Sequence, residues 1–313
     1  MKNLAIAVLA LMSVPASAAE PLKVTASFSI LADMVREVGG SRVEVTSLVG
    51  PGEDAHAFSP APTHAAMVAK ADVILINGLG FEGWMERLVQ SANAKGLVVT
   101  ATKGVKTIEP EEDGHDHGHD HGDDHGDDHG DDHGDDHGDE VDPHAWQDAR
   151  NGIVYAVNIA EGLCNVDSVN CAEYRANAAA YSTKLEAVDD EIRAAFAAIP
   201  EEGRKVITSH DAFGYFEAAY GVEFMAAHGV SEKSEASAKD IAKLIQQIKK
   251  EKVRALFVEN ISDPRLIEQI ATNAGIQPSG EIYSDALSPA GGPAATYIDM
   301  MRFNAHALAA AMR

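Results

Sequence analysis

The stretch CAEYRANAAAYSTKLEAVDDEIRAAFAAIP, residues 171–200, decides the fold predicted for this chain. Apolar side chains recur in it at steps of three and four residues, the spacing that places them on one face of an α-helix. They are Tyr174, Ala178, Tyr181, Leu185, Val188, Ile192 and Phe196. The pattern predicts one helix from Cys171 to Ala198, ended by Pro200 and Gly203. At about 1.5 Å per residue it spans ~40 Å. Since this is long for one small domain, we expect the helix to join two.

The sequence on either side of this helix alternates between short β-branched runs and amphipathic, helical runs. Such alternation is typical of β/α units built around a largely parallel sheet. Strands are expected at residues 23–28, 43–49, 72–77 and 96–101 before the helix, and at 205–209, 222–226, 254–259 and 279–284 after it. The sequence therefore predicts an α/β protein with two lobes, residues 20–170 and 201–313, joined by a linking helix at 171–200.

The chain begins with the features of a secretory signal peptide. Lys2 precedes the short apolar run LAIAVLALMSV, and Ala16–Ala18 provide small residues for cleavage. We expect residues 1–19 to be removed after Ala18 or Ala19 and the mature protein to be exported. The apolar run is too short to span a bilayer, and no cysteine directly follows it. We therefore expect the exported protein to carry no membrane anchor.

The charge of the chain is concentrated in one segment. The net charge is −24, but seventeen Asp and Glu and no Lys or Arg lie between Glu109 and Asp142, which leaves −7 for the rest. That value is ordinary for an acidic globular protein. The sequence has no basic patch or basic helix face, so nucleic-acid binding is not expected.

Residues 109–142, the His/Asp-rich segment, consist from Gly114 of six four-residue repeats, GHDH or GDDH. With almost no apolar residue the segment cannot bury a core, and we expect a disordered insertion in the first lobe. Its imidazoles and carboxylates can bind metal, but weakly, because binding must order a flexible backbone. Either the segment collects metal at low affinity or its affinity is incidental. Its histidines are His115, His117, His119, His121, His125, His129, His133 and His137.

The chain has two cysteines, Cys164 and Cys171. In an exported protein, a close and even pair predicts a disulfide. Two free thiols remain the alternative. A cysteine metal site is disfavoured, because no His or further Cys stands beside the pair at zinc-ligand spacing. The bridge would close a short loop and brace it locally.

Among the six remaining histidines, three stand in similar settings. His56 follows a predicted strand in GPGEDAHAFSP, His144 lies in VDPHAW, and His210 ends a strand in VITSHDAF. Asp285, in EIYSDALSP, also follows a predicted strand. Ligands of open α/β sheets gather at the carboxyl ends of strands, and three imidazoles with one carboxylate suit zinc. Four protein ligands leave little room for an activated water, which favours holding a metal over catalysis. The alternative is that these are ordinary loop histidines.

The other three histidines have structural explanations. His64 falls in the first turn of a helix, while His228 and His306 are expected to be surface or packing residues. Glu259 ends a predicted strand and either orients an imidazole or forms a salt bridge between the lobes.

Motifs of other functional classes are weak or missing. NGLGFEG at residues 77–83 has the glycine spacing of a dinucleotide site, but no acid follows about twenty residues later to bind a ribose. Its glycines are expected to permit a tight turn and close helix packing. The chain contains no H-E-x-x-H, G-x-S-x-G or Walker A motif.

Four motifs together resemble one known family. They are GPGEDAHAFSPAPTHAAMVAKADVILINGLGFEGWMERL, DPHAW, VITSHDAFGYF and YSDALSPAGGPAATYIDMMRFN. The chain is similar to the metal-binding solute receptors of zinc and manganese ABC importers, apart from the His/Asp-rich segment. It resembles most the zinc branch, whose members often carry a His-rich loop in this position.

The resemblance implies two α/β lobes joined by a rigid helix, with Zn²⁺ bound in the cleft by His56, His144, His210 and Asp285. Manganese-type members usually have Glu where this chain has His210, which points to zinc. It also implies a monomeric periplasmic receptor that delivers its ion to an inner-membrane ABC permease, with a periplasmic zinc donor as a further partner. The chain departs from the family in having Ala55 where Pro is common, and it lacks a C-terminal Cys pair found in some relatives.

Three other functions stay open at this point. A manganese receptor of the same family would use the same fold. A periplasmic zinc buffer would need no transporter. An exported metallohydrolase would need an open coordination position and a general base beside the metal.

Overall fold

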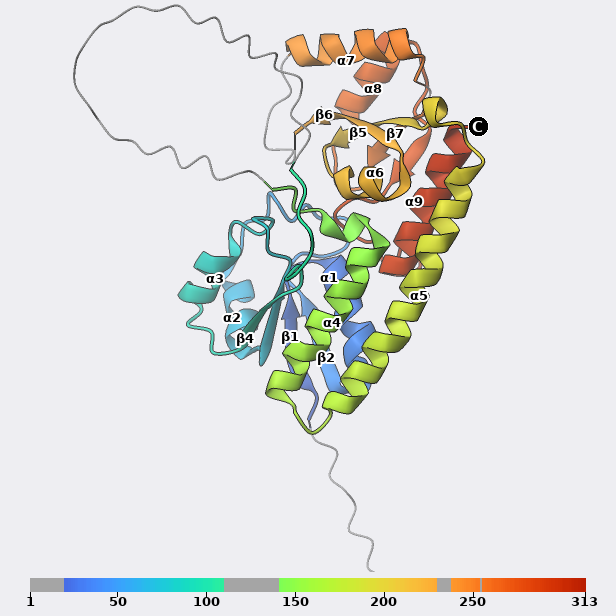
Figure 1. Ribbon diagram of the computed structural model, residues 1–313. Coiled ribbons are helices and arrows are strands. Elements are labelled where there is room, and N and C mark those ends of the chain that lie inside the picture. Colours follow the sequence, from blue (N-terminus) through green and yellow to red (C-terminus); the bar gives the residue numbers. More distant parts are fainter. Residues whose placement is uncertain (1–19, 110–140, 230–237, 254) are drawn as a thin grey trace, which may run out of the picture.

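Two separate parallel sheets organise the computed structural model, which describes residues 20–109, 141–229, 238–253 and 255–313 (Figure 1). The predicted α/β fold with two lobes and parallel sheets is confirmed. The expected signal peptide and the repeats of the His/Asp-rich segment lie outside the described residues.

The first sheet has the strand order β2-β1-β3-β4, with all neighbours parallel. The central strand β3 is an apolar run buried on both faces, and the second half of the other central strand, β1, is buried as well, which is typical of parallel sheets covered by helices. The strands are β1 (Leu22–Ala26), β2 (Val43–Ser47), β3 (Val73–Ile76) and β4 (Leu97–Thr100). The helices of this lobe are α1 (Ser29–Gly39), α2 (Pro62–Lys70), α3 (Met85–Ser91) and α4 (Ala149–Val166).

The second sheet repeats the same arrangement, with the order β6-β5-β7-β8. Its strands are β5 (Lys205–His210), β6 (Glu223–His228), β7 (Ala255–Glu259) and β8 (Gly280–Ile282). Its helices are α6 (Gly214–Tyr220), α7 (Ala238–Glu251), α8 (Pro264–Ala274) and α9 (Tyr297–Ala311). Short 3-10 turns occur at η1 (Gly40–Arg42), η2 (Ala145–Gln147) and η3 (Glu201–Gly203).

Helix α5 (Cys171–Ala197) runs along both lobes (Figure 1). All seven apolar residues of its predicted stripe are buried. The helix contacts α4 and α1 of the first lobe and α9 and α6 of the second. The predicted disulfide between Cys164 and Cys171 is confirmed, and it ties the last turn of α4 to the first residue of α5.

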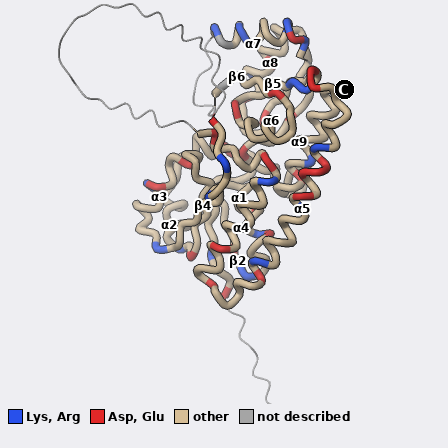
Figure 2. The backbone as a smooth tube through the Cα atoms, in the orientation of Figure 1, with Lys and Arg blue, Asp and Glu red and all other residues tan. Residues whose placement is uncertain are grey.

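The apolar core continues from the first lobe through α5 and α9 into one face of the second sheet. The opposite face of that sheet packs under α7 and α8 as a separate cluster. Basic and acidic residues are interspersed over both lobes (Figure 2). Among the described helices, none is long and apolar enough to cross a membrane.

Candidate metal centre

The candidate site lies where the carboxyl ends of the two sheets meet. His56 follows β2, His144 comes shortly before η2, His210 is the last residue of β5, and Asp285 follows β8. Each predicted ligand therefore comes from a different connection, and the four are brought together although they span most of the sequence. This is the edge at which parallel α/β sheets present ligand-binding loops.

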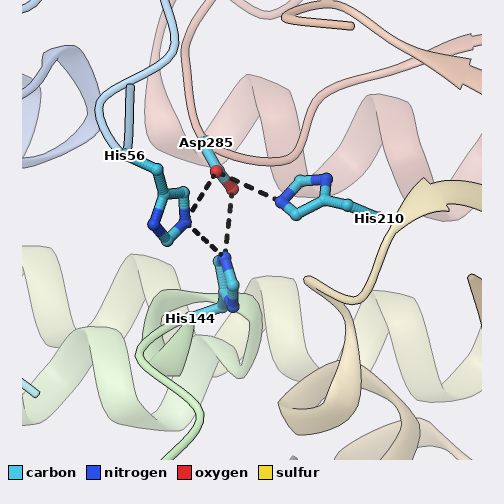
Figure 3. A group of neighbouring side chains, drawn as sticks. All are labelled: His56, His144, His210 and Asp285. Atoms are coloured by element: carbon cyan, nitrogen blue, oxygen red, sulfur yellow. Dashed lines mark hydrogen bonds and ion pairs between the residues drawn. The ribbon is translucent and has the colours of Figure 1, made fainter. Parts of the chain in front are cut away.

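The four side chains point at a common centre (Figure 3). One ligand atom of each lies within 4.8 Å of the others. His56 Nε2 lies 3.1 Å from His144 Nε2 and 3.4 Å from Asp285 Oδ2. Asp285 also approaches His210 Nε2, at 3.3 Å, and His144 Nε2, at 3.7 Å. Zinc bonds of about 2.0–2.1 Å in a tetrahedron place ligand atoms about 3.4 Å apart, and the four separations of 3.1–3.7 Å are close to that value.

The hydrogen bonding of these groups also fits a metal. Both carboxylate oxygens of Asp285 and Nε2 of His210 are buried, and apart from contacts of 3.3–3.7 Å within the site they have no well-formed hydrogen bond with the described residues. Buried polar groups without partners are rare in folded proteins, because desolvation is costly. A cation bound among them would satisfy all three atoms.

Asp142 holds His144 in position. One carboxylate oxygen, Oδ1, accepts the His144 backbone N–H at 2.8 Å and lies 2.8 Å from His144 Nδ1. A proton on Nδ1 leaves Nε2 free to bind a metal, the arrangement usual for metal-binding histidines. The backbone N–H of Asp142 also donates to Ile108 O at 3.0 Å, so the last residue of the His/Asp-rich segment is bonded to the residue that precedes the segment.

Glu259 has the same relation to His210. Its Oε1 accepts the backbone N–H groups of Ser209, at 2.8 Å, and His210, at 2.9 Å. Its Oε2 lies 2.7 Å from His210 Nδ1, and both side chains are fully buried. The two residues end neighbouring strands, since β5 pairs with β7. Of the two alternatives for Glu259, this placement fits the orientation of an imidazole.

His56 sits on a turn organised by Asp54. The Asp54 carboxylate accepts the backbone N–H of His56 at 2.7 Å and that of Ala57 at 3.2 Å, as in other turns built on Asp. Ala55, where relatives commonly have Pro, is buried, and its carbonyl accepts the indole N–H of Trp84 at 2.8 Å. The turn is therefore fixed without a proline.

The segment that carries Asp285 is fixed by contacts to both lobes. Asn304 of α9 brackets Tyr283, accepting its N–H at 2.9 Å and donating to its carbonyl at 2.6 Å. The Ser284 carbonyl accepts from Trp146 Nε1 and Gln147 Nε2, each at 2.9 Å. As a result Asp285 is held against the first lobe, although it follows a strand of the second.

Two of the imidazoles favour the protonated form when no metal is bound. Burial opposes a charge on His144, but the carboxylates of Asp285 and Asp142 outweigh it and raise its pKa to about 9. Burial likewise opposes a charge on His210, where Glu259 and Asp285 raise the pKa well above its ordinary value. A cation that binds these two imidazoles must displace their protons.

The other two ligands have shifts of the opposite sign. Burial lowers the pKa of His56, against the influence of Asp285. Burial would raise the pKa of Asp285, but His144 and His210 hold it well below its usual range. Asp285 is therefore ionised and His56 neutral at neutral pH, the forms in which each binds a metal.

The remaining histidines lie elsewhere. His64 Nδ1 accepts the Ala61 N–H at 2.8 Å at the start of α2, and His306 is exposed on α9. The side chain of His228 and the eight histidines of the repeats are outside the described part of the chain.

The glycines at residues 77–83 form the expected tight turn, with positive φ at Gly78 and Gly80. The close packing expected there occurs only at Gly78, where a Cβ would lie 2.5 Å from Thr100 Cγ2. That neighbour belongs to strand β4 and not to a helix, and Gly83 has open space around it, so the expectation of helix packing was wrong.

Three residues that support the ligands were not predicted from the sequence: Asp142, Asp54 and Asn304. The first two stand two residues before a ligand, in DPH and DAH. That repeated spacing could have identified them. Asn304 acts from a helix about twenty residues away from Asp285, and no sequence signal marks it.

Comparison with known proteins agrees with this geometry. Residues 24–311 match the family described as ZnuA, zinc-uptake complex component A, periplasmic. The chain is 32% identical to the manganese-binding lipoprotein MntA of Halalkalibacterium halodurans, over 91% of this chain and 86% of that protein. It is 33% identical to the iron ABC transporter substrate-binding lipoprotein MtsA of Streptococcus pyogenes, over 91% and 87%.

The fold is shared with a solved structure as well. The periplasmic zinc binding protein TroA from Treponema pallidum superposes with a TM-score of 0.81 at 29% sequence identity, covering 94% of this chain and 99% of that one. The relatives are thus named for three different metals. Fold, site and sequence together show that the chain belongs to the ZnuA family of metal-binding substrate receptors of ABC importers.

Proposed function

We propose that this protein is the zinc receptor of an ABC importer, binding Zn²⁺ through His56, His144, His210 and Asp285 and delivering it to an inner-membrane permease. The observation that carries the proposal is the third imidazole, His210, which is fully buried at the centre with its Nε2 directed at Asp285, 3.3 Å from Oδ2. Three imidazoles and one carboxylate suit zinc, whereas manganese prefers sites richer in oxygen ligands.

A manganese receptor is the second candidate, because relatives of similar identity are named for manganese. The two are separated by equilibrium dialysis of the metal-free protein against equal concentrations of Zn²⁺ and Mn²⁺, followed by metal analysis. The proposal expects one tightly held equivalent of zinc, and retention of manganese would refute it. Replacing His210 by Ala should weaken the tight site strongly, and an unchanged affinity would remove His210 from the ligand set.

We further propose that the His/Asp-rich segment is an accessory that collects zinc at low affinity, either directly or from a donor protein. The support is compositional, since each repeat offers imidazole and carboxylate groups on a polar backbone. Deletion of residues 114–138 should leave one tight site and remove several weak ones in a zinc titration. Loss of the tight site on deletion would contradict the four-residue centre.

The proposed location is the periplasm, with residues 1–19 cleaved and the mature receptor free and monomeric. Relatives are named lipoproteins, but both cysteines of this chain form the disulfide, so neither is available to carry a lipid. In this receptor the lobes are residues 20–170 and 201–313, linked by 171–200. Fractionation of cells should release the protein with the soluble periplasmic contents, and retention in the membrane fraction would contradict a free receptor.

A further inference from the structure

The turn at residues 77–83 lies directly against the metal centre. Its Phe81 ring meets the His56 ring edge-on, with centroids 4.5 Å apart, and the His144 ring, with centroids 6.0 Å apart. Three consecutive residues, Gly78, Leu79 and Gly80, have φ values of 90°, 55° and 79°. Positive φ suits glycine but is unfavourable for leucine, and such a conformation persists only where its surroundings fix it.

Glu82 provides that fixation. Its buried carboxylate accepts the backbone N–H of Asn77 at 2.6 Å, that of Gly78 at 3.2 Å, and the hydroxyl of Ser27 at 2.5 Å. Ser27 directly follows strand β1. The turn is therefore tied to the carboxyl end of strand β1, and this fixes the backbone of Asn77, the first residue of the turn.

That residue, Asn77, is fully buried and uses its side-chain amide in three hydrogen bonds. Nδ2 donates to the Pro143 carbonyl at 2.9 Å and to the Gly78 carbonyl at 3.0 Å, while Oδ1 accepts the Tyr155 hydroxyl at 2.5 Å. The amide is thus held on both sides, and one of its N–H groups is directed at a segment 66 residues away in the sequence.

Pro143 lies between Asp142, which orients the His144 imidazole, and His144 itself. A proline has no N–H, so its carbonyl is the one backbone group by which hydrogen bonding can hold it. A shift of this carbonyl would move Asp142 and His144 together. It would therefore change the 3.1 Å separation between His144 Nε2 and His56 Nε2.

We propose that Asn77 is a positioning residue of the metal centre, which fixes the His144 imidazole relative to the other ligands by holding the Pro143 carbonyl. This inference rests on the proposed function, because it takes His144 as a ligand. The competing explanation is that Asn77 only stabilises the end of strand β3, and the two differ in what happens to the geometry of a bound ion.

The test compares Asn77→Ser with a matched control, Asn158→Ser. Serine is too short to reach the Pro143 carbonyl. Asn158 also donates to two backbone carbonyls, Ala101 O at 2.7 Å and Lys103 O at 2.8 Å, but it holds the turn after β4 and not a ligand. Three measurements are made on the full chain: the visible spectrum with Co²⁺, zinc affinity by chelator competition, and urea unfolding without metal.

The proposal expects the Co²⁺ spectrum of Asn77→Ser to change and its zinc affinity to fall about 10- to 100-fold, while Asn158→Ser keeps both properties of the parent. An unchanged spectrum and affinity in Asn77→Ser, with lower stability alone, would overturn it, as would equal changes in the control. If the parent itself binds neither ion tightly, the proposed function fails instead.

If Asn77→Ser does not fold, Tyr155→Phe is the second variant. It keeps the aromatic ring and removes only the hydroxyl that orients the Asn77 amide. A spectral change in the same direction would support the proposal, and a spectrum identical to that of the parent would overturn it.

Discussion

Replacement of Glu259 by Gln tests how the His210 imidazole is prepared for a metal. In the protein, Glu259 Oε1 accepts two backbone N–H groups and Oε2 faces His210 Nδ1 at 2.7 Å. Glutamine has the same shape, but it places an NH₂ donor where Oε2 was. A metal on Nε2 requires the His210 proton on Nδ1, so two donors would then face each other. Either the glutamine turns and leaves the two backbone N–H groups unpaired, or the proton moves to Nε2 and blocks the metal.

The size of the effect follows from the contact that is lost. A hydrogen bond to a charged group contributes about 1.5–3 kcal/mol, which corresponds to a roughly 10- to 150-fold loss of zinc affinity. Glu259 is also a main reason that the pKa of His210 is raised. In the parent, protons compete with zinc for His210 at low pH. Without the Glu259 carboxylate the pKa of His210 is lower and this competition is weaker. The loss of zinc affinity relative to the parent should therefore be larger at pH 8 than at pH 6.

Chelator competition with Zn²⁺ at both pH values measures this change. Glu281→Gln is the matched control, since it makes the same substitution at an exposed position on the neighbouring strand β8. The control should keep the affinity of the parent. A Glu259→Gln protein that binds zinc within about threefold of the parent at pH 8, well inside the expected loss, would refute the reasoning.

Three further predictions concern protons and stability. Asp285 and Asp142 raise the pKa of His144 to about 9 against burial, and that of His210 is raised as well, so both are protonated in the metal-free protein at pH 7. Calorimetry in buffers of different ionisation enthalpy should therefore find about two protons released per zinc, and affinity should rise from pH 6 to pH 8; release of none would contradict the ligand set. Burial raises the pKa of Asp33 from 3.8 to about 6, so the parent loses stability as the pH rises through this range and the carboxyl ionises. Relative to the parent, Asp33→Asn should gain about 2 kcal/mol in unfolding free energy between pH 4 and pH 7. The same difference between variant and parent at both pH values, measured by urea unfolding, would count against this. Joint replacement of Cys164 and Cys171 by Ser should cost about 2 kcal/mol, because the bridge closes a short loop. Zinc affinity should not change, since the bridge joins α4 to α5 away from the ligands.

The sequence points to the four residues of the candidate site because local signals mark them. Each of His56, His210 and Asp285 follows a predicted strand, and parallel strands present their carboxyl ends at one edge of a sheet. His144 was identified from the motif DPHAW and not from a strand end. What the sequence does not contain is the relation between the two sheets, whose carboxyl edges must face each other for four ligands to meet.

The same limit applies to the supporting contacts and to the short elements. Asn77 acts on Pro143 across 66 residues, and such a pairing depends on tertiary packing and not on a local pattern. Helix α6 has only seven residues, too few to show a helical period, and it was not predicted. Helix α9 begins at Tyr297, capped by the Thr296 side chain, earlier than the apolar run FNAHALAAAM indicates.

The wide spacing of the four ligands has a consequence for the chain as a polymer. Under the proposed function, an ion held at positions 56, 144, 210 and 285 would be a reversible cross-link that closes loops of 88, 66 and 75 residues. Cross-links of long loops remove many conformations from the unfolded chain, and a ligand that binds only the folded state stabilises it further. The loaded and empty receptors therefore differ in rigidity even where their shapes are alike. Loading is therefore expected to slow proteolysis of the receptor as well as its unfolding.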